Sequence, residues 1–270
     1  MAVKWVDRVP TNPNRMKITP ETGSPYYATV ERADNPSVEG TPVNAANLNA
    51  MQETTGLSAN RTVYVSSAGS DNIGDGTEAN PYATINKALA TIPRNLNGFT
   101  ATINVAAGTY AESVLVANFG NGTVRITGVE GAVVTVNRLE ANNVKMFEIV
   151  NIALDISGCF FHAVSSGVRV TAPVTTNGAV YGVYATNFSN VVFASTLTIN
   201  NTTNYAVVST SGSRVYVTNI TGSGNKVTFA STLGGICAFG VDSSSVTGAQ
   251  YFTDTGGRIY SGSQASIPSY

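Results

Sequence analysis

Beyond residue 100, short apolar stretches recur at a nearly constant distance along the chain. Gly-, Asn- and Ser-rich turns separate them, and a new stretch starts after about 22 residues each time. A period in the low twenties without a helix in each unit is typical of stacked coils of strand that bury a continuous core. The pattern predicts an all-β parallel solenoid of six or seven coils. The strand-like segments begin at Thr102, Thr123, Lys145, Val168, Val191 and Val215.

Two antiparallel folds, the β-sandwich and the jelly roll, also contain many short strands. Neither keeps so even a spacing as a rule, and neither gives a reason for a helix ahead of the strands. The parallel solenoid is therefore the preferred interpretation.

One amphipathic helix is expected ahead of the coils, over residues 82–92, and Pro93 ends it. An open sheet edge invites pairing with other chains unless it is covered. We expect this helix to close the first end of the solenoid, and residues 245–270 or a second chain to close the other. Its apolar positions follow helical spacing at Ile85, Ala88, Leu89 and Ile92.

The first 42 residues hold six of the ten prolines and are predicted to form an extended arm. Within it, residues 15–19 and 26–32 are expected to pair as a hairpin. A short helix is expected to start at Thr41, a good N-cap, and to stop at Gly56. A helix of this length is marginal alone and needs a partner. The chain thus divides into an arm (1–56), a first strand with loop and helix (57–100), and a coil body with a C-terminal cap (101–270).

Charge and composition exclude several classes of protein. Fifteen Lys or Arg against sixteen Asp or Glu leave no basic excess, which argues against a nucleic-acid binder. No apolar run approaches the roughly 18 residues of a membrane span, and no secretion signal is recognisable at the start. Residues 101–270 hold only seven Lys or Arg and seven Asp or Glu. Their surface must be solvated by Ser, Thr and Asn, or covered by partners.

Cysteine and histidine offer little chemistry. Cys159 and Cys237 lie far apart in apolar settings and form no CxxC motif, so two buried free thiols are expected. His162 is the one histidine and has no nucleophile motif beside it, so we expect a structural or surface role. No cofactor is expected.

Residues 63–93 resemble the opening of right-handed parallel β-helix proteins of the pectin-lyase-like class, which implies a right-handed coil. That class includes lyases, hydrolases, phage tailspikes and inert stalks, so the fold alone assigns no activity. The motifs that carry the resemblance are Val63-Tyr-Val-Ser, Gly69-Ser-Asp71, Asp75-Gly-Thr77, Asn80-Pro-Tyr82, Thr84-Ile85 and Lys87-Ala-Leu89.

A second resemblance covers residues 12–52, which are similar to the N-terminal segment of tail proteins from phages and prophages of Gram-positive bacteria. Together the two imply a tail fibre, tailspike or baseplate appendage of a virion or tail-like particle. They also imply a homotrimer that joins other tail proteins through residues 1–56. The motifs are Arg15-Met-Lys-Ile-Thr-Pro20, Val30-Glu-Arg-Ala-Asp-Asn-Pro36 and Glu39-Gly-Thr-Pro-Val-Asn-Ala-Ala-Asn-Leu-Asn-Ala-Met51. The candidate assembly residues of this arm are Trp5, Arg15, Tyr26, Tyr27, Leu48 and Met51.

An enzymatic tailspike needs paired carboxylates. Glu140 and Glu148 are expected to face each other on successive turns, and Glu148 and Asp155 to flank one apolar strand pair. The alternative is that all three are isolated surface carboxylates, balanced by nearby Arg and Lys. Asp71 and Asp75 lie in an oxygen-rich segment that suits calcium, although Asp, Asn and Gly are also ordinary turn residues.

Four tyrosines in the middle coils are candidates for glycan or receptor contact, because aromatic faces beside Asn amides suit sugars. Side-chain ladders between coils explain the same residues equally well. The favoured function is a non-enzymatic tail appendage that contacts the host surface. The alternatives are a polysaccharide depolymerase and a purely structural baseplate or collar protein. The four tyrosines are Tyr181, Tyr184, Tyr205 and Tyr216.

Overall fold

The computed structural model describes residues 56–128, 131–157, 161–178, 180–239 and 251–261, and the backbone of a hairpin at 15–18 and 26–29. The chain divides into two units, Met1–Thr55 and Gly56–Tyr270. In the first, β1 (Arg15–Ile18) and β2 (Tyr26–Thr29) pair antiparallel, which confirms the predicted hairpin and places Arg15, Tyr26 and Tyr27 on its strands. The predicted helix after Thr41 and the candidate residues Trp5, Leu48 and Met51 lie outside the described residues.

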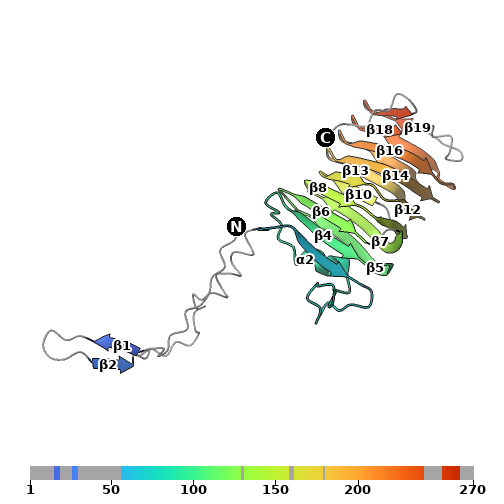
Figure 1. Cartoon of the computed structure of the whole chain (residues 1–270). Helices are drawn as coiled ribbons and strands as arrows, with labels where there is room; N and C mark the ends of the chain where they lie inside the picture. Colours follow the sequence, from blue (N-terminus) through green and yellow to red (C-terminus); the bar gives the residue numbers. More distant parts are fainter. Residues whose placement is uncertain are drawn as a thin grey trace, which may run out of the picture. The chain divides into compact units, whose positions relative to one another are not determined.

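The second unit is a right-handed parallel β-helix, as predicted (Figure 1). All strand pairings described within it are parallel, which excludes the antiparallel sandwich and jelly roll. The strands stack in three rows, and one coil of chain passes over the rows in turn. We call these rows faces 1, 2 and 3.

The faces are defined by their strands. Face 1 contains β3 (Arg61–Val65), β4 (Thr100–Val105), β6 (Thr123–Thr127), β8 (Met146–Ile149), β11 (Gly167–Val170), the first parts of β14 (Asn190–Asn200) and β16 (Arg214–Thr221), β18 (Ile236–Phe239) and β20 (Arg258–Ser261). Face 2 contains the first parts of β5 (Gly108–Ala117) and β7 (Ala132–Asn142), β9 (Ile152–Ser157), β12 (Val174–Asn177) and the last parts of β14 and β16. Face 3 contains the last parts of β5 and β7, β10 (Phe161–Val164), β13 (Tyr181–Thr186), β15 (Tyr205–Ser209), β17 (Val227–Ser231) and β19 (Tyr251–Thr253).

Face 1 accounts for the period in the sequence. Val124, Phe147, Val168, Val191 and Val215 are register partners on successive coils, and all five are buried. Each coil therefore consumes about 22 residues before it returns to the same place on face 1. An apolar residue occupies this position on each of these coils, which produces the period seen in the sequence.

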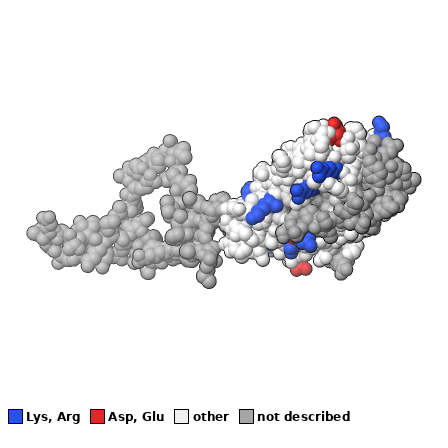
Figure 2. Space-filling view, turned by 90° about the horizontal axis from the view of Figure 1, so that it is seen from above, with Lys and Arg blue, Asp and Glu red and all other residues white. Residues whose placement is uncertain are grey.

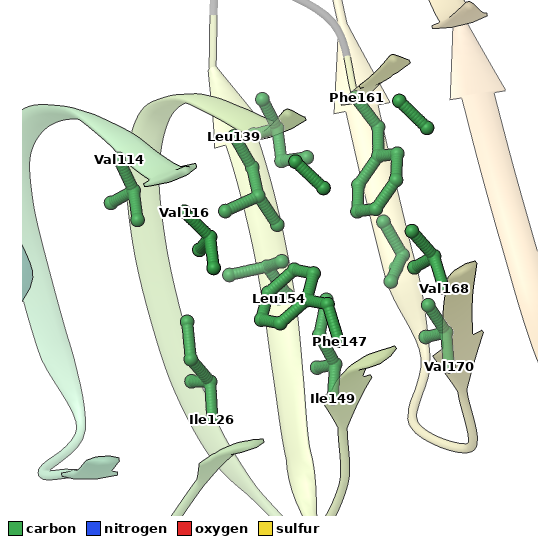
Figure 3. Packing of buried hydrophobic residues seen from close by; sticks show 14 of the residues in the cluster. Val114, Val116, Ile126, Leu139, Phe147, Ile149, Leu154, Phe161, Val168 and Val170 are labelled. Carbon is green, nitrogen blue, oxygen red and sulfur yellow. The ribbon is translucent and has the colours of Figure 1, made fainter. Parts of the chain in front are cut away.

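The core runs through the middle of the coils, because alternate residues of each strand point inward. Figure 3 shows inward side chains of successive coils gathered between the strands, among them Leu139 and its register partner Phe161. The rings of Phe161 and Phe193 meet edge to face at 5.6 Å between centroids. This continuous apolar column is the main stabilising element of the unit. Its largest fully buried aromatic side chains are Phe119, Phe147, Phe161, Phe193 and Phe229.

The expected helix is present as α2 (Ile85–Ala90), shorter than the predicted segment 82–92. The hydroxyl of Thr84 accepts the backbone N–H of Lys87 and caps its first turn. The four predicted apolar positions are all buried. The carboxylate of Glu112 in β5 accepts the backbone N–H groups of Ile85 and Asn86 at 2.7 and 3.0 Å. The helix is thereby fastened to the first coil.

At the other end, β19 and β20 continue faces 3 and 1 as further parallel strands. The described part of the C-terminal stretch therefore lengthens the stack. The expected covering of the last edge by residues 245–270 stays a prediction, because the remainder of that stretch lies outside the described residues.

Gly222 marks a close approach between two coils. It has a φ of 136°, and a Cβ there would overlap the carbonyl oxygen of Ile199 on the preceding coil. Gly131 also has a positive φ, of 80°, but a Cβ there would meet no atom within 4 Å. The two glycines therefore separate the effect of backbone conformation from the effect of coil contact.

We expect Gly222→Ala to lower the free energy of unfolding by about 1–3 kcal/mol more than Gly131→Ala, because only the first forces two coils apart. Urea unfolding followed by circular dichroism measures both variants. Equal losses would contradict the close coil contact at Gly222.

Candidate functional site

A row of aromatic side chains crosses face 3 from coil to coil, and we call it the aromatic row. It consists of His162, Tyr184, Tyr181, Tyr205 and Phe252. Centroid distances between consecutive rings in this order are 5.3, 5.0, 6.2 and 6.2 Å. The rings of Tyr181 and Tyr205 are stacked, with only 5° between their planes. The row joins the outer side of β10, β13, β15 and β19.

The register of the parallel strands produces two of the four ring contacts in the row. His162 pairs with Tyr184, and Tyr181 pairs with Tyr205. Register partners on adjacent strands lie about 4.8 Å apart, so large side chains at such positions must touch. Rings at partner positions therefore form a ladder without any further interaction to align them.

The aromatic row is only partly covered. Tyr181, Tyr184 and Tyr205 are half-buried, and Phe252 is 43% exposed. Burial raises the pKa of Tyr184, and the neighbouring Tyr181 adds to that rise. The Asn204 side-chain amide donates to the Tyr181 hydroxyl at 3.5 Å. Each tyrosine thus combines an apolar ring with a polar edge at the surface.

Tyr216, grouped with these tyrosines by sequence, does not belong to the row. It lies on face 1, where its register partners are Val192 and Ala238, and it is 5% exposed. The expectation that it contacts a glycan is therefore wrong, because so buried a side chain offers no surface to a ligand.

A polar cluster lies where the aromatic row begins. The Arg138 guanidinium donates to the Glu140 carboxylate at 2.5 Å, and Nδ1 of His162 lies 3.6 Å from the same oxygen, Oε2. Burial lowers the pKa of His162, and Arg138 lowers it further, while Glu140 raises it. Because burial is the largest cause, the imidazole is held neutral at neutral pH.

The three candidate catalytic carboxylates do not come together. Glu140 lies on face 3, Glu148 on face 1 and Asp155 on face 2. Glu148 accepts two hydrogen bonds from Arg125, at 2.9 and 2.7 Å, on the preceding coil. The expectation that Glu140 and Glu148 face each other on successive turns is therefore wrong. The corner between faces 3 and 1 separates them.

Asp71 and Asp75 hold a loop together. Asp71 accepts the backbone N–H groups of Ala83 and Thr84 at 2.8 and 3.1 Å and the Thr84 hydroxyl at 2.7 Å. Asp75 accepts the N–H and the hydroxyl of Thr77, which lowers its pKa. These contacts account for both carboxylates as turn residues, the alternative considered from the sequence.

Other reactive groups are sparse in the described ranges. Cys237 is a free, fully buried thiol, and burial raises its pKa to about 12. Within those ranges, no three His, Cys, Asp or Glu residues gather where they would hold a metal ion. A helix that crosses a bilayer needs about 20 residues, and the described part of the chain contains none that qualifies. Cys159 lies outside the described residues.

Comparison with known proteins adds no assignment: no family model, curated protein or solved structure matches the chain. The class that the coordinates define is the right-handed parallel β-helix. Sequence reasoning missed His162 and Phe252 as members of the aromatic row. One signal was available for His162, because it precedes its register partner Tyr184 by one coil of the observed period.

The pKa shift of His162 predicts how stability changes with pH. The folded pKa lies below the unfolded value of 6.5, so the unfolded chain takes up the proton first as the pH falls. We expect the free energy of unfolding of the wild type to decline from about pH 7.5 to pH 5.5. The free energy of unfolding of His162→Gln should decline less over the same range. Urea unfolding at several pH values measures both. Tyr184→Phe is the control that keeps the wild-type slope, and identical slopes for His162→Gln and wild type would contradict the assignment.

The three hydrogen bonds to Asp71 predict a structural role. We expect Asp71→Ala to lower the free energy of unfolding by about 2 kcal/mol, because part-buried donors next to α2 lose a charged acceptor. Asp75→Ala, which affects an exposed local turn, should lower it less. Thermal unfolding with and without calcium tests the alternative, that Asp71 binds a calcium ion. A calcium-dependent rise in melting temperature that Asp71→Ala abolishes would show a metal site instead.

Proposed function

We propose that this chain is a structural and adhesive component of a phage tail or tail-like particle. In this proposal residues 1–56 join the chain to other tail proteins, and the β-helix presents face 3 to a glycan on the host surface. The chain assembles as a homotrimer and cleaves no glycan. The aromatic row is the single observation that carries the adhesive part of the proposal.

The aromatic row has the chemistry and the rigidity of a sugar-binding surface. Half-exposed rings offer apolar faces to the C–H groups of a sugar, and tyrosine hydroxyls and the Asn204 amide offer polar groups at their edges. The backbone on which they stand is hydrogen-bonded to a neighbouring coil on each side. Little ordering is then needed on binding, which favours affinity.

The attachment part of the proposal rests on residues 1–56. This part is proposed from their similarity to tail proteins alone, and the motif region contains the β1–β2 hairpin. Such a hairpin is only marginally stable alone, so it needs a partner surface to stay folded. A tail protein or a second copy of the chain would supply it.

A depolymerase is the weaker alternative. Hydrolysis of a glycosidic bond needs two carboxylates about 5–10 Å apart on one surface, whereas Glu140, Glu148 and Asp155 lie on three different faces. A purely structural baseplate or collar role is the alternative for a chain that binds no host surface.

Binding of the full-length protein to purified cell walls from a panel of Gram-positive bacteria tests the proposal. We expect retention on at least one of them, and a loss of about tenfold or more for the double variant Tyr181→Ala, Tyr205→Ala. Phe188→Ala is the matched control, because Phe188 is 83% exposed but lies at a turn outside the row.

Two results would overturn parts of this proposal. Absence of binding to all walls, with an intact melting transition, would favour the purely structural role. Release of reducing ends that Glu140→Gln abolishes would establish the depolymerase. The mass of the purified protein in solution tests the homotrimer directly.

A further inference from the structure

We infer that the aromatic row takes an uncharged glycan chain lying parallel to the axis of the β-helix. This inference rests on the proposed function and names the class and the orientation of its ligand. Three observations carry it: the direction of the row, its charge and the position of the exposed Lys226 immediately before β17 of face 3.

The direction of the row follows from the ring contacts. The contacts from His162 to Tyr184, from Tyr181 to Tyr205 and from Tyr205 to Phe252 each pass from one coil to a later one. The strands involved, from β10 to β19, are four coil steps apart. At about 4.8 Å a step, the row extends roughly 19 Å along the axis. A linear chain laid along the axis covers all its rings, whereas one laid along a strand covers those of a single coil.

The charge of the row is neutralised within itself. Arg138 and Glu140 form an ion pair at its first end, and burial keeps His162 neutral. The outer positions that follow on β15 and β17, Val208 and Ala230, are apolar, and because both are buried they add neither charge nor exposed surface to the row. An acidic chain would lose hydration along such a surface without gaining an opposite charge. Figure 2 shows the wider context, a surface with a few separate Lys and Arg side chains and little acid.

One exposed cation needs separate treatment. Lys226 immediately precedes β17, and its backbone N–H donates to the carbonyl oxygen of Thr202. An acidic ligand would use this side chain, whereas an uncharged ligand has no need of it. Lys226 therefore distinguishes the two ligand classes by a single substitution.

The experiment uses the full-length protein on an array of bacterial surface glycans that carries uncharged chains and chains bearing uronate or phosphate. We expect the bound chains to be uncharged. Titration calorimetry on the best one should show nearly constant affinity from roughly 0.05 to 0.5 M salt. Oligomers too short to span the row should bind about tenfold more weakly.

Variants separate the row from its surroundings. Tyr205→Leu, which keeps apolar volume but removes the central ring, should weaken binding about tenfold. Phe188→Leu and Lys226→Ala should leave it unchanged, and melting curves confirm that each variant is folded. Salt-sensitive binding of acidic chains that Lys226→Ala abolishes would overturn the inference while leaving the proposed function standing. Binding of no glycan at all, with self-association that Tyr205→Leu abolishes, would overturn both and assign the row to contacts between copies of the chain.

Discussion

The structure depends on one constraint, the in-register hydrogen bonding of each coil to the next. Parallel pairing satisfies the backbone N–H and C=O groups of a coil only through its neighbours, so each strand position is repeated about 4.8 Å further along the axis. A single coil exposes its apolar side and cannot fold alone. The inward column of Val124, Phe147, Val168 and Val191 and the helix α2 at its first end both follow from this constraint.

The same constraint organises the surface, because a residue type repeated at one position stacks on itself. Thr198 and Thr221 share a hydrogen bond at 3.0 Å, and the Asn201 amide donates to Asn177 at 2.9 Å. In these polar ladders the side chains of adjacent coils use their hydrogen-bonding groups on each other. Aromatic positions differ, since stacked rings on face 3 still leave apolar surface and polar edges at the solvent boundary. The proposed glycan contact therefore uses face 3, where the stacked rings remain partly exposed.

Some charged side chains of the coil body are paired locally, either between adjacent coils or within one strand. Arg125 and Glu148 are register partners on adjacent coils of face 1 and form an ion pair, and Arg138 and Glu140 form another within one strand on face 3. Pairing of this kind explains how a chain so poor in charge keeps carboxylates at its surface without gathering them. It also separates the candidate catalytic carboxylates, because Glu140, Glu148 and Asp155 lie on three different faces.

The sequence by itself determined the solenoid, its period, the capping helix and the hairpin, because hydrophobic spacing reports directly how much chain one coil consumes. It also indicated Tyr181, Tyr184 and Tyr205, but not which face each outer residue occupies. Coil lengths differ slightly from one turn to the next, and β14 shifts register against β16 between Phe193 and Thr196. Counting residues across the corner between two faces therefore does not tell which side chains point outward on the next face. Only the tertiary structure could therefore move Tyr216 off the row, separate Glu140 from Glu148, and bring His162 and Phe252 beside the tyrosines.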